Sequence, residues 1–430
     1  MVINTYNMTE KLFQYIWQHR LFNHSIQLQT IENEDVIIIH PGSLNTHAGP
    51  DFLEAKVKIG DTIWAGNIEL HLKSSDWNKH LHQHDINYSN LILHVVYEYD
   101  EPIQIFENKS FPTLSLKQAI NMNLIDNYEK LMNNAAFIPC ASFIHTIKEI
   151  TISQQLDRML AERLEEKTDY IKELLLRYKN NWQEVFYVLL AKGFGLHINQ
   201  DAFERLALQT PLNLFAKHKQ QPIQIEALLF GQAGFLDDYF DEIYPQLLQK
   251  EYAYLKKLYS LHAIEKHQWK FLRLRPANFP TLRIAEFAQL LHESTHLFSK
   301  IVEASSLKEI EQLLKVTVSN YWLTHFTFQE KSNEQNKSMG KTFIQLLIIN
   351  VIIPTIFIYG KLQGKTAYSD KAIEWIRQIP AEKNSLITQW IVLGIKPSSA
   401  ADTQALLQLK KYYCDKKRCL ECSIGFALMK

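Results

Sequence analysis

Two acidic residues near the N-terminus have the types and the spacing of a divalent-metal site. Asp51 lies in AGPDF and Glu69 in GNIELH, on either side of an expected β-turn. Side chains two apart in a strand share a face, so Glu69, His71 and Lys73 should project from one side of the second strand. Across a hairpin, the Asp51 and Glu69 carboxylates can reach one cation. Magnesium and manganese prefer oxygen ligands of this kind.

A cation held in this way can polarise a phosphoryl oxygen and activate a water. A basic side chain beyond the second carboxylate can stabilise the developing charge, which is the arrangement used for phosphodiester cleavage. Lys73 supplies a fixed charge, whereas His71 changes its charge near pH 7 and can also bind the metal. The alternative is a polar Glu69–His71 pair on a solvated face, with Gly49-Pro50 serving only as a turn.

A second polar group follows the hairpin and consists of His80, His82, His84, Asp85 and His94. On a helix, His80 and His84 would share a face at a spacing that suits transition-metal ligation, while His82 and Asp85 would share another. Each can equally be a surface or hydrogen-bonded structural residue. His94, inside an apolar strand, is either a core histidine or a residue that points into the same site as Glu69.

Three of the four cysteines form a C-x4-C-x2-C pattern at the C-terminus, at Cys414, Cys419 and Cys422. Two thiolates on a tight C-x2-C turn can face one soft metal. With Cys140 as the fourth ligand, the pattern predicts a zinc or iron–sulfur site. The alternative is three reduced surface thiols and one buried thiol.

Composition limits the classes of function. The 46 Lys and Arg residues balance the 46 Asp and Glu residues, so no overall positive field attracts nucleic acid. Basic and aromatic residues interleave between Tyr252 and Arg283, which is typical of a nucleic-acid surface and equally of a solvated amphipathic helix. Few cysteines and an N-terminus without a secretory signal favour the cytoplasm. The sequence assigns no oligomeric state.

The elements that must position these residues follow from periodicity. A short helix should follow Thr9, which can cap it, and a turn at Gly60-Asp61 should join two strands. We expect strands at Val36–His40, Ala55–Ile59, Thr62–Leu72 and Leu91–Tyr99. After about Gln118 the period becomes helical. Long helical stretches include Ile152–Arg177 and Arg283–Val302.

The fold class is therefore α+β, with a small mixed-sheet N-terminal domain followed by a large all-helical region. We expect the α/β domain at residues 1–118. Residues 119–430 should be helical, divided near residue 275, with the cysteines in a C-terminal tail. The apolar stretch Phe343–Tyr359 contains Gln345, Asn350 and Pro354, which favours a buried helix that breaks near Pro354 over a membrane span.

The order of these elements and the pattern PD followed by ExH resemble the PD-(D/E)xK nuclease superfamily over residues 8–100. This resemblance implies a nuclease-like, restriction-endonuclease-like α/β domain at residues 1–118. The resemblance implies that Asp51 and Glu69 bind the metal, with Glu10 as an additional carboxylate and the Leu70 carbonyl as a backbone ligand. His71 stands where the superfamily has its catalytic lysine. One upstream and three C-terminal cysteines are also similar to the clamp of some iron–sulfur nucleases of this superfamily, although the C-terminal spacing differs.

The whole chain resembles bacterial domain-of-unknown-function family 2851. The motifs that carry this resemblance are AGPDF, GNIELH, SDWNKHLHQHD, LILHVVYEYD, ALLFGQAGFL, LRPANFPTLR and the cysteine tail. Membership of this family implies no established reaction, substrate or partner.

The leading hypothesis is a magnesium- or manganese-dependent nuclease that acts on DNA or RNA. Asp51 and Glu69 would hold the ion, and His71 or Lys73 would stabilise the phosphoryl charge. The alternative is a non-catalytic scaffold that binds nucleic acid or protein and uses its cysteines for a structural metal.

Overall fold

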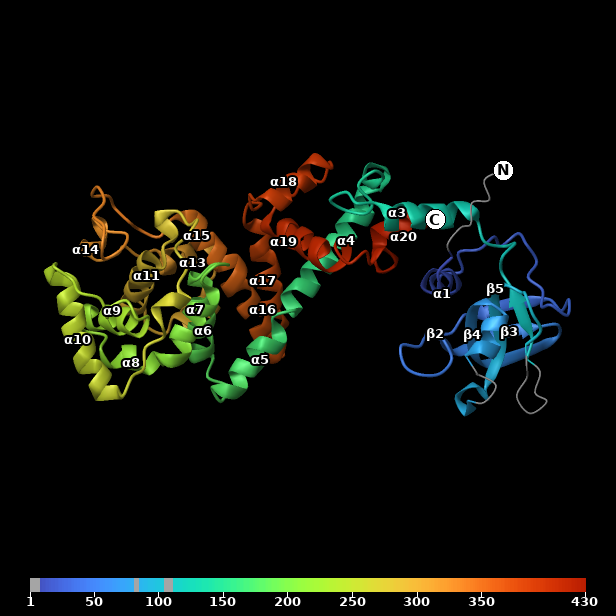
Figure 1. Cartoon of the computed structure of the whole chain (residues 1–430), viewed down its shortest axis with the longest axis horizontal. Helices are drawn as coiled ribbons and strands as arrows, with labels where there is room; N and C mark the ends of the chain where they lie inside the picture. The colour runs from blue at the N-terminus through green and yellow to red at the C-terminus, as the bar shows by residue number, and fades with distance from the viewer. Residues whose placement is uncertain (1–7, 81–84, 104–110) are drawn as a thin grey trace. The chain divides into compact units, whose positions relative to one another are not determined.

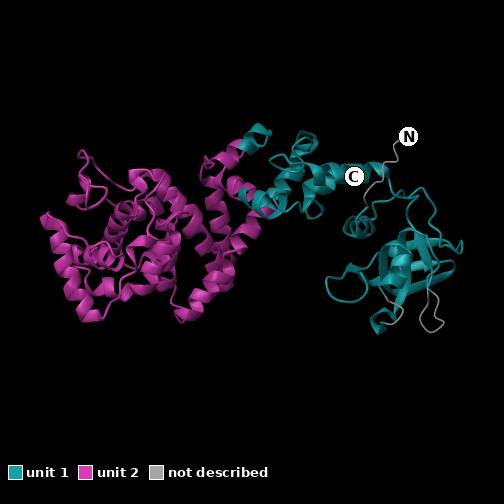
Figure 2. Ribbon diagram, viewed as in Figure 1, with its two compact units in different colours: residues 1–157, 389–395, 407–430 teal, residues 158–388, 396–406 magenta. Residues whose placement is uncertain are grey.

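The computed structural model describes residues 8–80, 85–103 and 111–430, which form two compact units (Figure 1, Figure 2). Unit 1 comprises residues 1–157, 389–395 and 407–430, and unit 2 comprises residues 158–388 and 396–406. The β-sheet lies in unit 1, and unit 2 is built from helices. The predicted α+β class is confirmed.

The sheet of unit 1 is mixed, and its strand order is β1-β3-β4-β5-β6 with β2 paired to β3. The strands are β1 (Val36–His40), β2 (Ser43–Leu44), β3 (Phe52–Ile59), β4 (Thr62–Lys73), β5 (Leu91–Glu98) and β6 (Thr113–Ser115). β1, β3 and β4 pair antiparallel, whereas β5 lies parallel to β4 and β6 parallel to β5. The predicted turn is present, because Ile59 pairs with Thr62 around Gly60, whose φ is +54°.

Helix α1 (Glu10–Gln18) covers one face of this sheet. Thr9 caps it as the sequence predicted, since the Thr9 side chain accepts a hydrogen bond from the backbone N–H of Leu12. Its apolar side chains share one core with residues of β4 and β5, among them Ile68 and Leu93. Each such side chain stabilises the fold by about 1.5–3 kcal/mol when fully buried.

The connection from β4 to β5 carries α2 (Ser75–Lys79) and the short helix η2 (Ile86–Tyr88). Trp77 of α2 is buried and lies edge-on to His71 and tilted against His94. Asp100 fixes the start of α2, because its carboxylate accepts hydrogen bonds from the hydroxyl groups of Ser74 and Ser75. Helix α2 is therefore held near the face of β4 that carries Glu69 and His71.

The rest of unit 1 is helical. Its elements are α3 (Met122–Asn133), η3 (Ile144–Thr146), the first part of α4 (Glu149–Glu165), η7 (Lys410–Cys414), η8 (Cys419–Glu421) and α20 (Ser423–Met429). Figure 1 shows α20 beside α3, where the Asn127 side chain donates a hydrogen bond to the Leu428 carbonyl over 3.0 Å. The predicted boundary at residue 118 falls just after β6, and the division of the chain into domains there stays a prediction.

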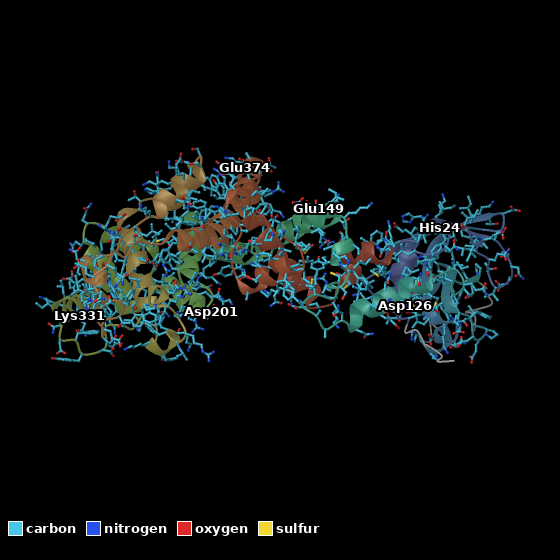
Figure 3. All side chains as sticks on the ribbon, turned by 90° about the horizontal axis from the view of Figure 1, so that it is seen from above. His24, Asp126, Glu149, Asp201, Lys331 and Glu374 are labelled. Carbon is cyan, nitrogen blue, oxygen red and sulfur yellow. The ribbon has the colours of Figure 1, made fainter. Side chains whose placement is uncertain are left out.

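Unit 2 is an array of helices with exposed charged side chains, such as Asp201 and Glu374 (Figure 3). Its elements are α5 (Thr168–Arg177), α6 (Trp182–Phe194), α7 (Gln200–Gln209), α8 (Leu212–Lys217), α9 (Pro222–Gln232), α10 (Ile243–Tyr259), η4 (Lys266–Gln268), η5 (Pro276–Asn278), α11 (Pro280–Glu293), α12 (Leu297–Glu303), α13 (Leu307–Leu314), α14 (Asn320–Leu323), α15 (Lys341–Leu347), η6 (Ile348–Ile352), α16 (Ile353–Leu362) and α17 (Thr366–Gln378). Helices α18 (Ser385–Val392) and α19 (Ala400–Leu409) contain residues of both units.

Two of the predicted long helical stretches are each divided into two helices. The stretch Ile152–Arg177 is divided between α4 and α5, and Arg283–Val302 is divided between α11 and α12. At the second break Ser294, the C-cap of α11, is extended, and His296, directly before α12, has a φ of +51°, so neither residue continues the α-helix. Arg283 is buried on α11 and ion-paired to Glu286, so it cannot contribute to a surface for phosphate groups.

The apolar stretch around Pro354 belongs to one helix, Lys341–Leu362. The predicted break near Pro354 is therefore wrong. The π-helical segment η6 precedes α16, and Pro354 stands in the first turn of α16. A local π-helical widening lets a helix continue close to a proline. The helix is long and apolar enough to cross a membrane, and 78% of its most apolar window is buried inside the protein, as in the core helix of a soluble protein.

Candidate functional site

Asp51 and Glu69 are hydrogen-bonded neighbours at the end of the β3–β4 hairpin. The backbone N–H of Asp51 donates to Oε2 of Glu69 over 3.0 Å, and the backbone N–H of Leu70 donates to Oδ2 of Asp51 over 3.0 Å. Phe52 pairs with Ile68 directly beyond them, so the register of the hairpin sets their positions. The structure thus brings together the two carboxylates on which the sequence analysis rests.

A closed loop presents Asp51 to the hairpin. The Asn45 side chain donates to the Pro50 carbonyl over 3.0 Å, and the Asn45 backbone N–H donates to the Asp51 carbonyl over 2.7 Å. Gly49 has a φ of +105°, a conformation that L side chains rarely adopt, so a glycine fits this turn. The Gly49-Pro50 turn therefore does more than reverse the chain, because the hydrogen bonds around it hold Asp51 in place.

Burial and nearby negative charge oppose the ionisation of both carboxylates. Burial raises the pKa of Glu69 to about 9, and the negative charge of Asp51 adds to that shift. Burial also raises the pKa of Asp51 to about 6, against the lowering effect of the hydrogen bond from Leu70. Such a pair gains electrostatic stabilisation from a bound cation, because the cation offsets both the burial and the repulsion.

Helix α1 adds two side chains to this site. Gln14 donates a hydrogen bond from Nε2 to Oδ1 of Asp51 over 2.8 Å, and the charge of Glu10 raises the pKa values of Asp51 and Glu69. Glu10 is exposed at the first turn of the helix. Sequence reasoning named Glu10 and missed Gln14, although the spacing of four residues places both on one helix face.

Buried histidines extend the site along β4 and β5. Nδ1 of His71 lies 2.9 Å from Nε2 of His94, and Nε2 of His71 lies 3.2 Å from Nδ1 of His80. Nε2 of His71 is also 3.7 Å from Oε1 of Glu69. His94 pairs in register with Glu69, so in a parallel ladder both side chains leave the same face of the sheet. His94 therefore contacts the site through His71.

The connection between β4 and β5 contains three further predicted residues, Asp85, His82 and His84. Asp85 caps η2 by accepting a hydrogen bond from the Asn87 backbone N–H. His82 and His84 lie outside the described residues. Tyr88, which sequence reasoning missed, is close enough to the carboxylates that the charges of Glu69 and Asp51, after burial, raise its pKa. Its only sequence signal is its position shortly before β5.

Lys73 lies near a different carboxylate, that of Asp100. Its side chain is exposed, and Nζ lies 3.9 Å from Oδ2 of Asp100. The two candidates for stabilising a phosphoryl charge therefore lie in different surroundings. His71 is buried beside Glu69, whereas Lys73 lies at the end of β4 near α2.

The four cysteines all belong to unit 1. Cys140 and Cys419 are buried, Cys414 and Cys422 are half-buried, and none of the four forms a disulfide. Burial raises the pKa of Cys140 to about 12, and the charges of Cys422 and Cys419 raise it as well. Cys140 is thus close to thiols of the C-terminal segment.

The donor set decides which ion the carboxylates fit. Within residues 8–80, 85–103 and 111–430, no group of three or more His, Cys, Asp or Glu side chains is arranged to hold a metal ion. Magnesium needs less than this, because one or two carboxylates suffice when waters and substrate phosphates fill the other positions. Asp51 and Glu69, with the nearby Leu70 backbone, fit an ion of that kind.

Residues 10–385 match a family model described as "Protein of unknown function (DUF2851)". The matched range includes α1 and the whole sheet, whereas Cys414, Cys419 and Cys422 lie beyond its end. Neither a curated protein nor a solved structure matches the chain.

Proposed function

Because the chain belongs to the DUF2851 family, whose description names no activity, we propose a function from the site itself: hydrolysis of phosphodiester bonds in nucleic acid, dependent on magnesium or manganese. The observation that carries the proposal is a pair of neighbouring carboxylates, half-buried Asp51 and buried Glu69: Glu69 accepts a hydrogen bond from the Asp51 backbone, and burial and the charge of Asp51 raise its pKa. Carboxylates are costly to bury in their ionised form. A site for a cation explains why both stand at one point.

The order of elements around this pair supports the same proposal. Helix α1, strand β1, the β3–β4 hairpin, helix α2 and strand β5 follow one another as expected of the PD-(D/E)xK core. Asp51 precedes the first strand of the hairpin and Glu69 lies in the second, where that resemblance places the metal ligands. This agreement concerns topology and position, and the activity is argued from the carboxylates.

Each residue has a definite part in the proposed reaction. Asp51 and Glu69 would hold the ion, and Gln14 is a positioning residue that orients Asp51. The bound ion would supply a Lewis acid for the phosphoryl oxygen and lower the pKa of a water. His71 lies next to Glu69 and would place a positive charge or a hydrogen-bond donor at the phosphoryl group. Lys73, held near Asp100, is the weaker candidate for that part.

Cleavage assays on the full chain test the proposal. Single- and double-stranded DNA and RNA are incubated with wild type, Asp51→Asn, Glu69→Gln and the matched control Glu54→Gln, each with Mg²⁺ and with Mn²⁺. Glu54 is an exposed carboxylate on the same hairpin. We expect cleavage by wild type and the control, and a loss of at least about 100-fold in both site variants.

The opposite outcome has a clear meaning. If wild type cleaves none of these substrates faster than Asp51→Asn does, the catalytic proposal is wrong. Nucleic acid that binds wild type and Asp51→Asn equally well, without turnover, would instead identify a non-catalytic binding scaffold.

A further inference from the structure

The cysteines of this chain come from two distant segments that meet in unit 1. Three of them lie in the C-terminal segment and one follows α3; the cysteine cluster is Cys140, Cys414, Cys419 and Cys422. The two segments are fastened around the cluster, because Ser423 donates its backbone N–H to Oε1 of Gln155 over 2.9 Å and Lys417 donates to the Met132 carbonyl. The proximity of the cysteines is therefore built into the packing of unit 1.

The local backbone turns the C-terminal cysteines toward a common region. The backbone N–H of Cys422 donates to the Cys419 carbonyl over 3.3 Å, which folds the C-x2-C segment into a tight turn. Gly425 packs directly on that turn, since a Cβ at this position would lie 2.1 Å from the Cys419 carbonyl oxygen. A turn of this kind brings two thiolates to one side, as in structural metal sites.

The thiols influence one another electrostatically. After burial, the charges of Cys140, Cys422 and Cys419 raise the pKa of Cys414. Burial also raises the pKa of Cys419 to about 12, with the charge of Cys422 as the second cause. A single buried cysteine is an ordinary small apolar residue. Packing alone gives no reason for all four cysteines of the chain to gather here.

We propose that the cysteine cluster binds one iron–sulfur cluster through four thiolates. A metal replaces the protons of the thiols and offsets the charge of the thiolates. Among the described residues no three such side chains are arranged to hold a single ion, which favours the iron–sulfur cluster, because its inorganic sulfides fill the space between more widely spaced thiolates. The inference is independent of the carboxylate site and of nuclease activity.

The physical role of the centre follows from the position of its ligands. Cys140 lies in the turn after α3, and the other ligands lie in the segment that ends the chain. The metal centre closes the long loop between them, which restricts the unfolded chain. It would therefore hold the C-terminal segment in unit 1.

The test begins with the metal content of the intact protein. The full chain is purified without oxygen, and iron, zinc and acid-labile sulfide are measured together with the visible absorbance. Iron with a similar amount of sulfide identifies a cluster and supports the proposal, whereas about one zinc without sulfide identifies a mononuclear site and overturns it. A protein with neither iron nor zinc overturns it, and this measurement needs no variant.

Variants then assign the ligands. We expect the metal content of Cys140→Ser and Cys422→Ser to be at least about 10-fold lower than that of wild type. The adjacent control Ser423→Ala should keep the metal content of wild type. Asp51→Asn should also keep it, which separates this centre from the carboxylate site. Metal that stays in all four Cys→Ser variants overturns the proposal. If a variant fails to fold, chelation and reloading of folded wild type give the same answer through the return of bound metal.

Discussion

The backbone N–H of Asp51 donates a hydrogen bond to the carboxylate of Glu69, and the residue after Glu69 donates one back to the carboxylate of Asp51. Each carboxylate is thus held by the strand that carries the other. This reciprocal arrangement fixes both groups through the register of one hairpin. A site fixed in this way is organised before a ligand arrives, which lowers the cost of binding.

Glu69→Gln should stabilise the metal-free protein at alkaline pH. The pKa of Glu69 is raised from 4.5 to about 9, so between these values the folded state keeps a proton that the unfolded state releases. The free energy of unfolding therefore falls as pH rises through this window. We expect the Gln variant to exceed wild type by about 1 kcal/mol or more at pH ~8 and to equal it at pH ~4.

Urea unfolding of the full chain with EDTA, followed by circular dichroism at both pH values, measures this difference. Glu54→Gln, which changes an exposed carboxylate of β3, should leave the free energy of unfolding unchanged at both. A Gln variant that is less stable than wild type at the alkaline pH would show that Glu69 stabilises the fold as a carboxylate.

Binding of Mn²⁺ should release protons. At pH ~7 the raised pKa of Glu69 means that a cation must displace its proton, whereas Asp51, with a pKa of about 6, is mostly ionised already. The apparent affinity should rise up to about 10-fold per pH unit between pH ~6 and ~8. Calorimetry in two buffers with different ionisation enthalpies measures the released protons. Equal enthalpies in the two buffers would contradict the raised pKa.

His71 should matter more to catalysis than Lys73. His71 is buried and its Nε2 lies 3.7 Å from Glu69, whereas the exposed Lys73 lies near Asp100. We expect His71→Gln to lower kcat by about 100-fold or more and Lys73→Met to change it by less than about threefold. Steady-state cleavage rates, with circular dichroism as a check on folding, decide between them. The reverse ranking would assign the role to Lys73.

Gly66→Ala should destabilise the sheet next to the site. A Cβ at this position would lie 2.5 Å from Cγ2 of Ile92 and 2.7 Å from the Asn90 carbonyl oxygen. The carbonyl cannot retreat freely, because it accepts a hydrogen bond from Asn67 over 2.9 Å. We expect a loss of about 1–3 kcal/mol in the free energy of unfolding. The exposed neighbour Ala65→Ser is the control, and equal stability of the two variants would refute the predicted clash.

Local chemistry made several features predictable from the sequence. The Thr9 cap depends on a side chain three residues from the N–H that it binds, and the Gly60 turn depends on adjacent residues. The two-residue period of β4 placed Glu69 and His71 on one face for the same reason. The change to a helical period after residue 118 likewise anticipated the α+β class.

Only the tertiary structure decided which distant groups meet. Gln14 contacts Asp51, His94 contacts His71, and Cys140 lies near the C-terminal cysteines through packing between separate elements. No period or motif within one segment encodes such contacts. The sequence by itself determined the local elements and the residue types, because these depend on short-range sterics and hydrogen bonds. The tertiary fold determined which of these elements and residues contact one another. Local sequence patterns allow many such pairings, and burial in a shared core selects among them.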